Sequence, residues 1–277
     1  MPELPEVETV VRGLQQRLAG RRFHRIDLNR ADLRGPLPQG LKAKLEGKRI
    51  ERVGRRAKYI LIHCEDDTVL LAHLGMSGRL VIHEPNGAWQ RGTHDHVVFT
   101  FDDGTILTFN DARRFGMMDH VAAAELNDHK LLRHLGPEPL GNEFSGPSLA
   151  KLLAGKNSSI KAALLDQRVV AGLGNIYVSE SLYWAGLSPR RNAGTVQGAR
   201  AEALAGAIRD TLTRAIAAGG SSLRDYVQAS GELGYFQHQW AVYGKESEPC
   251  PRCDCGKGIK RIVQNARSTF YCAKHQR

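Results

Sequence analysis

The sequence lacks long apolar segments. No apolar run approaches the roughly 20 residues that a membrane-spanning helix needs. Residues 1–6 (MPELPE) are acidic and lack the apolar core of a secretory signal. Internal repeats and low-complexity tracts are also missing. We therefore expect no membrane association and a cytoplasmic location.

Acidic residues are too few to balance the basic ones. The 277 residues include 39 Lys and Arg against 29 Asp and Glu, so the formal net charge is +10. A surplus of this size favours a polyanionic partner such as nucleic acid. The surplus is densest at the C-terminal end, where residues 251–277 hold seven Lys or Arg and one Asp. The length fits about two domains, at roughly 150 residues each.

Cysteines are few and unevenly placed. Cys64 stands alone, and the other four of the five lie between positions 250 and 272. The odd count and the missing secretory signal argue against a disulfide framework. The spacing Cys250-x2-Cys253-x18-Cys272-x2-His275 is instead typical of two knuckles that hold one tetrahedral zinc ion. Four protein ligands leave no open position, so this ion is expected to be structural.

The fourth zinc ligand has an alternative. Cys255 follows Cys253 by two residues and competes with His275 for that position. The two-residue spacing from Cys272 favours His275. Arg267, which precedes the second knuckle, is suited to binding phosphate or a base edge.

Hydrophobic periodicity predicts an α+β protein. Residues 5–19 have apolar side chains at helical spacing, with Pro5 in the first turn and Gly20 at the end. Residues 22–120 are typical of short strands. Strands are predicted at 79–83, 96–101 and 105–109, the last two forming a hairpin around Asp102-Asp103-Gly104. This series of strands predicts a sandwich or a barrel.

After position 122 the period becomes helical. Helices are predicted at 122–134, 148–155, 159–168, 175–185 and 198–218, and a loop or lid at 221–240. The Gly- and Pro-rich stretch near 135–147 marks a domain boundary. We therefore predict a catalytic domain at 1–134, a linker at 135–148, a helical domain at 149–240 and a zinc finger at 241–277.

The N-terminus carries a possible nucleophile. Removal of Met1 would expose the secondary amine of Pro2, and an α-amino group titrates near ~8, so part of it is neutral and nucleophilic at pH 7. Such an amine can attack a sugar C1′ to form a Schiff base, after which elimination of the 3′ phosphate can follow. Glu3 and Glu6 lie one helical turn apart beside it and can transfer protons.

Motifs along the whole chain resemble those of the formamidopyrimidine-DNA glycosylase family. They are the N-terminal MPELPEVET (1–9), the lysine motif RRAKY (55–59), the DNA-facing loops at 73–78, 94–96 and 110–116, the interdomain segment at 135–140, the helix-two-turn-helix at 172–180 and the terminal cysteine module. The matches occur in order from end to end. The fold implied is an N-terminal β-sandwich with an N-terminal helix, followed by a helical helix-two-turn-helix domain and a zinc finger.

The resemblance also implies roles for individual residues. Pro2 would be the Schiff-base nucleophile, Glu3 would protonate the sugar ring and Glu6 would support the site. Lys58 would aid elimination near the lesion phosphate, and Arg267 would assist the second elimination. DNA contacts would come from His73, Met76, His94, Arg113, Phe115, Lys156 and Asn175, of which Met76, Arg113 and Phe115 would fill the space left by the flipped nucleotide. Residues 226–240, with Tyr235 and Phe236, would cover the flipped base.

The activity implied is that of a bifunctional glycosylase and AP lyase, acting as a monomer on double-stranded DNA that contains oxidised purines or abasic sites. In the cell it would associate with the nucleoid through DNA. The family's fourth zinc ligand is usually cysteine, so His275 departs from the pattern.

Two other functions compete with this hypothesis. The endonuclease VIII branch prefers oxidised pyrimidines, but Leu4 and the long segment before the zinc finger favour the purine branch. A non-catalytic damaged-DNA-binding protein would keep the helical domain and the finger, but Pro2, Glu3, Glu6 and Lys58 are all present. An RNA-binding zinc protein would explain the charge but not the N-terminus.

Overall fold

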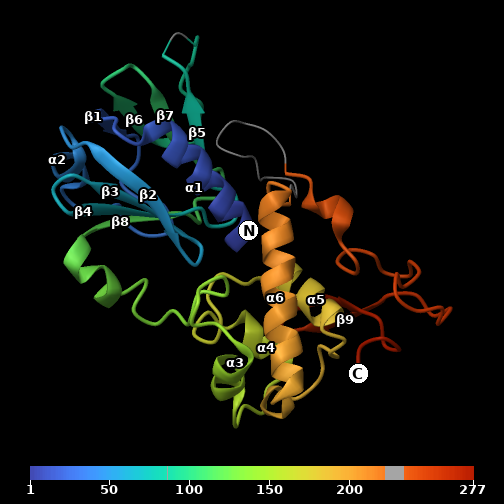
Figure 1. Cartoon of the computed structure of the whole chain (residues 1–277). Helices are drawn as coiled ribbons and strands as arrows, with labels where there is room; N and C mark the ends of the chain where they lie inside the picture. The colour runs from blue at the N-terminus through green and yellow to red at the C-terminus, as the bar shows by residue number, and fades with distance from the viewer. Residues whose placement is uncertain (86, 222–233) are drawn as a thin grey trace. The chain divides into compact units, whose positions relative to one another are not determined.

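The computed structural model describes residues 1–85, 87–221 and 234–277. The chain divides into two compact units, coloured by residue number in Figure 1. Unit 1 comprises Met1–Arg133 with Ala218–Tyr235, and unit 2 comprises His134–Ala217 with Phe236–Arg277. The structure thus groups part of the predicted loop at 221–240 with the N-terminal unit. None of the described helices is both long and apolar enough to cross a membrane.

Unit 1 is a β-sandwich with a helix against it. One antiparallel sheet has the order β1-β6-β7-β5 and the other the order β2-β3-β4-β8. The strands are β1 (Phe23–Leu28), β2 (Ile50–Arg56), β3 (Tyr59–Cys64), β4 (Thr68–His73), β5 (Arg79–His83), β6 (Asp95–Phe101), β7 (Ile106–Asn110) and β8 (Met117–Ala122), with a short helix α2 (Leu41–Leu45) after β1. Both sheets contribute to one apolar core, which confirms the predicted sandwich.

Helix α1 (Leu4–Leu18) forms where the periodicity predicts it. Its apolar stripe, which includes Val7, Val10, Leu14 and Leu18, is buried in the core of unit 1. The helix contacts β2 and β3. Because burial of an aliphatic side chain contributes roughly 1.5–3 kcal/mol, this stripe fixes the N-terminus of the chain to the sandwich.

The predicted hairpin around Asp102-Asp103-Gly104 joins β6 to β7. Gly104 has φ +85°, a left-handed conformation that favours glycine in tight turns. On β6, the rings of Phe99 and Phe101 lie 5.7 and 5.1 Å from that of Phe23 on β1. These three aromatic rings therefore pack together in the core of unit 1.

Unit 2 is helical and ends in a two-stranded hairpin. Its helices are α3 (Gly146–Leu153), α4 (Ile160–Leu165), α5 (Asn175–Trp184) and α6 (Ala199–Ala217), and its strands are β9 (Lys260–Gln264) and β10 (Arg267–Tyr271). Short 3-10 helices occur at η2 (Ala193–Thr195) and η3 (Phe236–Gln239). Helix α5 is buried along most of its length and contacts α4, α6 and β10, so it forms the centre of the unit.

The prediction of a helix at 122–134 is wrong. Only a 3-10 helix, η1 (Ala123–Asp128), forms there, and it buries none of its residues. The chain turns instead, and Asp119 Oδ2 lies 3.3 Å from His129 Nε2 and 3.0 Å from Lys130 Nζ after the turn.

Residues 226–233 of the predicted lesion loop at 226–240 lie outside the described residues. At its described end, Tyr235 is 64% exposed, whereas Phe236 is 2% exposed and its ring lies 5.8 Å from that of Tyr177. Phe236 therefore packs within unit 2 in this structure.

Candidate functional site

The start of α1 buries two carboxylates. Glu3 and Glu6 are 4% and 3% exposed, and Pro2 is buried beside them. Glu3 N donates to Glu6 Oε2 at 2.9 Å, and the Glu3 side chain accepts the backbone N–H of Glu6. This capping box satisfies N–H groups that a helix start otherwise leaves unpaired. The three predicted N-terminal residues are thus held in one fixed arrangement.

The second oxygen of Glu6 holds another segment of unit 1. Glu6 Oε1 accepts the backbone N–H of Ser221 at 2.8 Å. A Cβ added at Gly220 would lie 3.1 Å from the same oxygen, and one added at Gly234 would lie 2.4 Å from Gly220 O. Residues on both sides of 222–233 are therefore fixed next to Glu6. A single carboxylate links the N-terminus to the base of that segment.

Lys58 follows a tight turn between β2 and β3. It is 6% exposed, and Ala57 before it has φ +52°. Arg55 donates from Nη1 to Ala57 O and from Nε to Glu8 Oε2 on α1, both at 2.9 Å. Burial would raise the pKa of Glu8, but its bonds to Arg55 and Arg12 lower it overall. The lysine turn is thereby attached to the N-terminal helix by an ion pair.

His73 ends β4 as a neutral imidazole. Burial, with the nearby charges of Lys58 and Arg34, lowers the pKa of His73 to about 4. Its Nδ1 accepts the N–H of Gly75 at 3.0 Å, which leaves the ring proton on Nε2. The ring also packs 4.9 Å from that of Tyr59. Lys58 and His73 therefore form one group, with a cation beside a neutral donor.

Two loops of unit 1 expose large apolar side chains. Met76 is 38% exposed and Phe115 is 41% exposed. The guanidinium of Arg113 lies 5.0 Å from the Phe115 ring centroid, within cation–π range. Gly75 allows the close approach of the loops, since a Cβ there would lie 2.3 Å from the Phe115 backbone. The structure thus brings together the three residues predicted to replace the flipped nucleotide.

Asp111 fixes these two loops from beneath. It is fully buried, accepts Ser77 Oγ at 2.5 Å through Oδ1, and accepts Gly116 N at 2.7 Å through Oδ2. Ser77 Oγ in turn accepts the N–H of Arg113 at 3.1 Å. The predicted contact residue His94 lies in the same region, because its carbonyl accepts the N–H of Asp111 at 3.0 Å. The anchoring role of Asp111 was not predicted from the sequence.

In unit 2, Asn175 is hydrogen-bonded to the hairpin at the residue after Arg267. Asn175 Nδ2 donates to Ser268 O at 2.9 Å and to the Tyr243 hydroxyl at 3.3 Å. Its Oδ1 is buried without a hydrogen-bond partner among the described residues. Arg267, at the start of β10, is exposed. Lys156 lies after α3, where its carbonyl accepts the N–H of Gly194 at 2.9 Å.

Two buried charges to which the sequence analysis assigned no role hold the C-terminal segments, although Glu180 ends the 172–180 motif. Lys161 on α4 is fully buried, and its Nζ donates to Ser268 O at 2.9 Å and to Thr269 Oγ1 at 2.6 Å. Glu180 on α5 accepts the N–H groups of residues 241–243 at 2.8, 2.9 and 2.8 Å. Burial raises the pKa of Glu180 in spite of these donors. A lone charge within an apolar helical run was the signal available in the sequence for both.

Three cysteines form a cluster that could hold a metal ion. The sulfurs of Cys250, Cys253 and Cys272 all lie within 4.8 Å of one another. Two thiolates on one tetrahedral zinc ion lie about 3.8 Å apart, given Zn–S bonds of about 2.3 Å. The cluster therefore has suitable donors and spacing for such an ion. The predicted ligand His275 is not in this cluster, and its Nε2 lies 3.1 Å from Tyr183 O.

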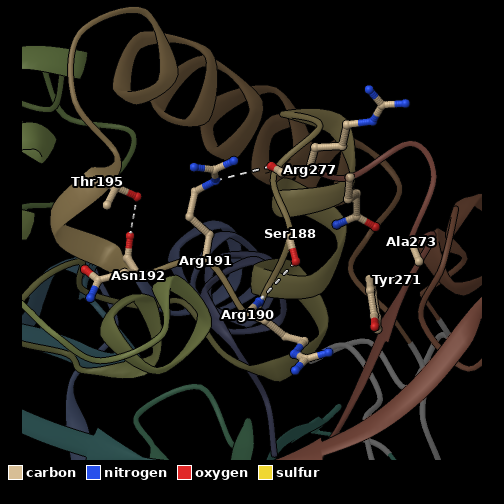
Figure 2. A pocket seen from close by; sticks show the side chains of 9 residues that line it. Ser188, Arg190, Arg191, Asn192, Thr195, Tyr271, Ala273 and Arg277 are labelled. Atoms are coloured by element: carbon tan, nitrogen blue, oxygen red, sulfur yellow. Dashed lines mark hydrogen bonds between the residues drawn. The ribbon is translucent and has the colours of Figure 1, made fainter.

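A basic hollow lies beyond the C-terminal end of α5. Arg190, Arg191 and Arg277 line it, and Arg191 Nε donates to Arg277 O at 3.2 Å (Figure 2). Asn175 begins the same helix, so the hollow lies at the other end of α5 from Asn175. None of the predicted site residues lines it.

A basic chain that joins a carboxylate-bearing sandwich to a helical unit with a cysteine cluster has the parts of a DNA glycosylase. The model of the formamidopyrimidine-DNA glycosylase N-terminal domain matches residues 1–118, and the model of the family's H2TH domain matches residues 135–227. The chain belongs to the formamidopyrimidine-DNA glycosylase family. The predicted family, fold class and glycosylase activity are confirmed.

Similar proteins cover the whole chain. A formamidopyrimidine-DNA glycosylase from Rhodospirillum centenum is 59% identical, and one from Ruegeria pomeroyi is 54% identical, with full coverage of both chains in each case. The solved Lactococcus lactis Fpg bound to DNA with N7-benzyl-Fapy-dG is 35% identical over all of both chains, with a TM-score of 0.89. MutM (Fpg) from Thermus thermophilus is 37% identical over 99% of this chain and 98% of its own, with a TM-score of 0.86.

Replacement of Lys161 by Met should destabilise unit 2. The change removes a buried ammonium that donates to β10, and hydrogen bonds to charged groups contribute about 1.5–3 kcal/mol. We expect the free energy of unfolding in urea to fall by roughly 2 kcal/mol. Lys151→Met, on the exposed side of α3, is the matched control. Equal stability of the two variants would show that Lys161 does not anchor the hairpin.

Replacement of Asp111 by Asn should loosen the two exposed loops. An amide nitrogen cannot accept a hydrogen bond, so either Ser77 or Gly116 would lose its acceptor. We expect faster amide hydrogen exchange at residues 75–78 and 112–116, with the core strands unchanged. Asp102→Asn makes the same chemical change at an exposed turn. Unaltered exchange in both loops would contradict the anchoring role.

Proposed function

We propose that the chain removes oxidised purines from double-stranded DNA and then nicks the strand at the resulting abasic site. The buried Glu3–Glu6 pair beside Pro2 is the observation that carries this proposal. It places proton-transfer groups where Met1 removal would leave a secondary amine. Solved relatives from Lactococcus lactis are bound to DNA that contains Fapy-dG or an abasic site, which supports the substrate class.

The proposed chemistry begins with Pro2. Its nitrogen forms a bond to C1′ while the glycosidic bond breaks, and the base leaves with the proton that Pro2 loses. Glu3 then donates a proton to O4′ as the C1′–O4′ bond opens, which yields the iminium. Loss of a C2′ proton expels the 3′ phosphate, and loss of a C4′ proton then expels the 5′ phosphate. Glu6 positions Glu3 throughout through the 2.9 Å bond to its backbone.

DNA contacts are assigned to both units. In unit 1, Lys58 and His73 would bind the lesion phosphate, and His94 and Arg113 would contact DNA nearby. Flipping a nucleotide costs a few kcal/mol, and apolar wedges such as Met76 and Phe115 fill the space that it leaves. In unit 2, Lys156, Asn175 and Arg267 would bind backbone phosphates, with Arg267 assisting the second elimination.

Zinc is proposed as a structural ion. Cys250, Cys253 and Cys272 would hold it, and the sequence offers His275 or Cys255 as the fourth ligand. A bound ion of this kind contributes roughly 10–16 kcal/mol to the folding of a small module. It takes no part in the steps above. We further propose that the enzyme is a monomer that acts in the cytoplasm, at the nucleoid.

Oxidised pyrimidines are the second candidate substrate. A Lactococcus lactis Fpg, which is 35% identical with a TM-score of 0.88, is bound to DNA containing an oxidised pyrimidine. The test is excision of 8-oxoguanine opposite C compared with excision of thymine glycol. Faster removal of thymine glycol would identify oxidised pyrimidines as the preferred substrate.

Borohydride trapping tests the nucleophile. Met1-processed protein is incubated with a duplex that carries 8-oxoguanine opposite C, and the reductant should convert the iminium to a stable covalent adduct. Pro2→Gly should weaken or abolish the adduct. Glu3→Gln should slow base excision by about 10²–10⁴-fold, the usual contribution of a general acid. Glu125→Gln, an exposed site on η1, is the control for the same substitution.

The outcomes of this experiment separate enzyme from binder. Tight binding of the lesion duplex without any adduct would leave a damage-binding protein and refute the lyase. An adduct that Pro2→Gly leaves unchanged would assign the nucleophile to another amine.

Salt dependence tests the phosphate contact of Arg267. Each phosphate contact contributes a slope of about −0.9 to the plot of log K against log salt concentration. Arg267→Ala should weaken binding and reduce that slope by about 0.9. Arg190→Ala, in the hollow at the other end of α5, should leave the slope unchanged. Identical slopes for both variants would remove Arg267 from the DNA-binding surface.

A further inference from the structure

A fourth thiol lies against the cysteine cluster. The sulfur of Cys255 is 3.9 Å from that of Cys272, and the sulfur of Cys253 is 3.4 Å from the same atom. Tetrahedral zinc thiolates lie about 3.8 Å apart, given Zn–S bonds of about 2.3 Å. Cys255 thus has the spacing of a ligand relative to Cys272, although, like His275, it lies outside the set of sulfurs that are all within 4.8 Å of one another.

The turn that carries Cys255 has the hydrogen-bonding pattern of a metal knuckle. The backbone N–H of Lys257 is hydrogen-bonded to the sulfur of Cys255, as that of Arg252 is to the sulfur of Cys250. On the other side of the cluster, His275 N donates to Cys272 Sγ at 3.4 Å. Cys255 is therefore oriented by the chain in the same way as a cysteine of the cluster.

The residues after Cys255 are fixed as well. Gly256 and Gly258 have φ +64° and +63°, and a Cβ on Gly258 would lie 2.7 Å from Ser247 O. Ser247 N donates to Ile259 O at 2.8 Å, and Ile259 N donates to Glu248 O at 2.8 Å. The position of Cys255 is thus constrained by a tight turn that is paired with residues 246–248.

His275 is part of a tail that is hydrogen-bonded to the segment after α5. Its Nε2 lies 3.1 Å from Tyr183 O, and its ring packs 4.9 Å from that of Tyr183. Next along the chain, Gln276 Nε2 donates to Leu187 O and Arg277 N donates to Gly186 O, both at 2.9 Å. Arg191 Nε also donates to Arg277 O at 3.2 Å, next to the hollow shown in Figure 2.

A hydrogen bond from Nε2 is compatible with metal binding through Nδ1, so it does not by itself exclude His275. Three further contacts nevertheless hold the tail: the Gln276 and Arg277 bonds to Leu187 and Gly186, and the Arg191 bond to Arg277. The tail can therefore keep its place without a histidine–metal bond.

We propose that Cys255 is the fourth zinc ligand, so that four thiolates hold the ion and His275 remains outside as an anchor of the C-terminal tail. This inference rests on the proposed structural zinc. The extra thiolate makes the site more negative than one with three thiolates and an imidazole. Arg252 is adjacent in sequence to Cys253 and Lys257 lies two residues after Cys255, so both cations can offset that charge. Arg252 also stacks 4.7 Å over Trp184.

Zinc K-edge X-ray absorption of the purified, zinc-loaded full-length protein tests the proposal without any substitution. The expected result is a single shell of four sulfurs at about 2.3 Å. A fit that requires three sulfurs and one nitrogen at about 2.0–2.1 Å would overturn it. If the protein as purified binds no zinc at all, the structural zinc itself fails, and this outcome is distinct from a histidine ligand.

Two variants give an independent readout by zinc competition with a chelator. Cys255→Ser should weaken zinc binding by more than about 100-fold, beyond the usual effect of residues outside the ligand shell. His275→Gln should change it by less than about tenfold and keep the four-sulfur shell. Cys64→Ala removes a cysteine from unit 1 and controls for the total thiol count. The reverse order of effects for Cys255 and His275 would refute the proposal.

Discussion

The carboxylate of Glu6 is the constraint on which the N-terminal site depends. A buried charge is costly unless hydrogen bonds satisfy it, and Glu6 is satisfied by backbone N–H groups from two separate segments, Glu3 and Ser221. The bond to Glu3 fixes the residue next to Pro2. The bond to Ser221 fixes the chain as it enters residues 222–233. Movement of either segment would break one of these two hydrogen bonds to Glu6.

The same principle recurs wherever an exposed functional loop must be held. Asp111 lies beneath the Met76 and Phe115 loops, and Lys161 lies beneath the hairpin that carries Arg267. Each is fully buried and bonded to groups far away in sequence. Apolar packing is non-directional, whereas a buried charge requires particular partners at particular distances. Such residues give loops with little core of their own a defined geometry.

Sequence reasoning succeeded where the signal is local or repeats along the chain. The apolar stripe of α1, the turn at Gly104 and the spacing of Cys250 and Cys253 all belong to short segments, and the structure contains them where they were expected. It failed at 122–134, where only a 3-10 helix with no buried residues forms. The order of the motifs identified the family. It did not show which buried charges hold the motif segments in place.

Long-range contacts account for the features of the site that were not predicted from the sequence. Lys161 and Ser268 are more than a hundred positions apart, and Asn175 also gives its amide to Ser268. Asn175 is thus a hairpin contact in this structure, whereas the sequence predicts a phosphate contact. The two roles are compatible, because the N–H groups at the start of α5 remain suited to an anion.

Exposure of Met76 and Phe115 has a thermodynamic cost that the fold must offset. Each leaves apolar area in water, at about 25 cal/mol per Å², unless a partner covers it. The Arg113–Phe115 stack and the Asp111 network keep these side chains extended rather than collapsed onto the sandwich. A side chain that is already ordered before binding loses little entropy when it enters a duplex. More of the free energy gained by its burial is then left to offset the cost of flipping a base. Met76 and Phe115 contribute nothing to the core of unit 1, and the proposed function gives this exposed pair its role as the surface that enters DNA.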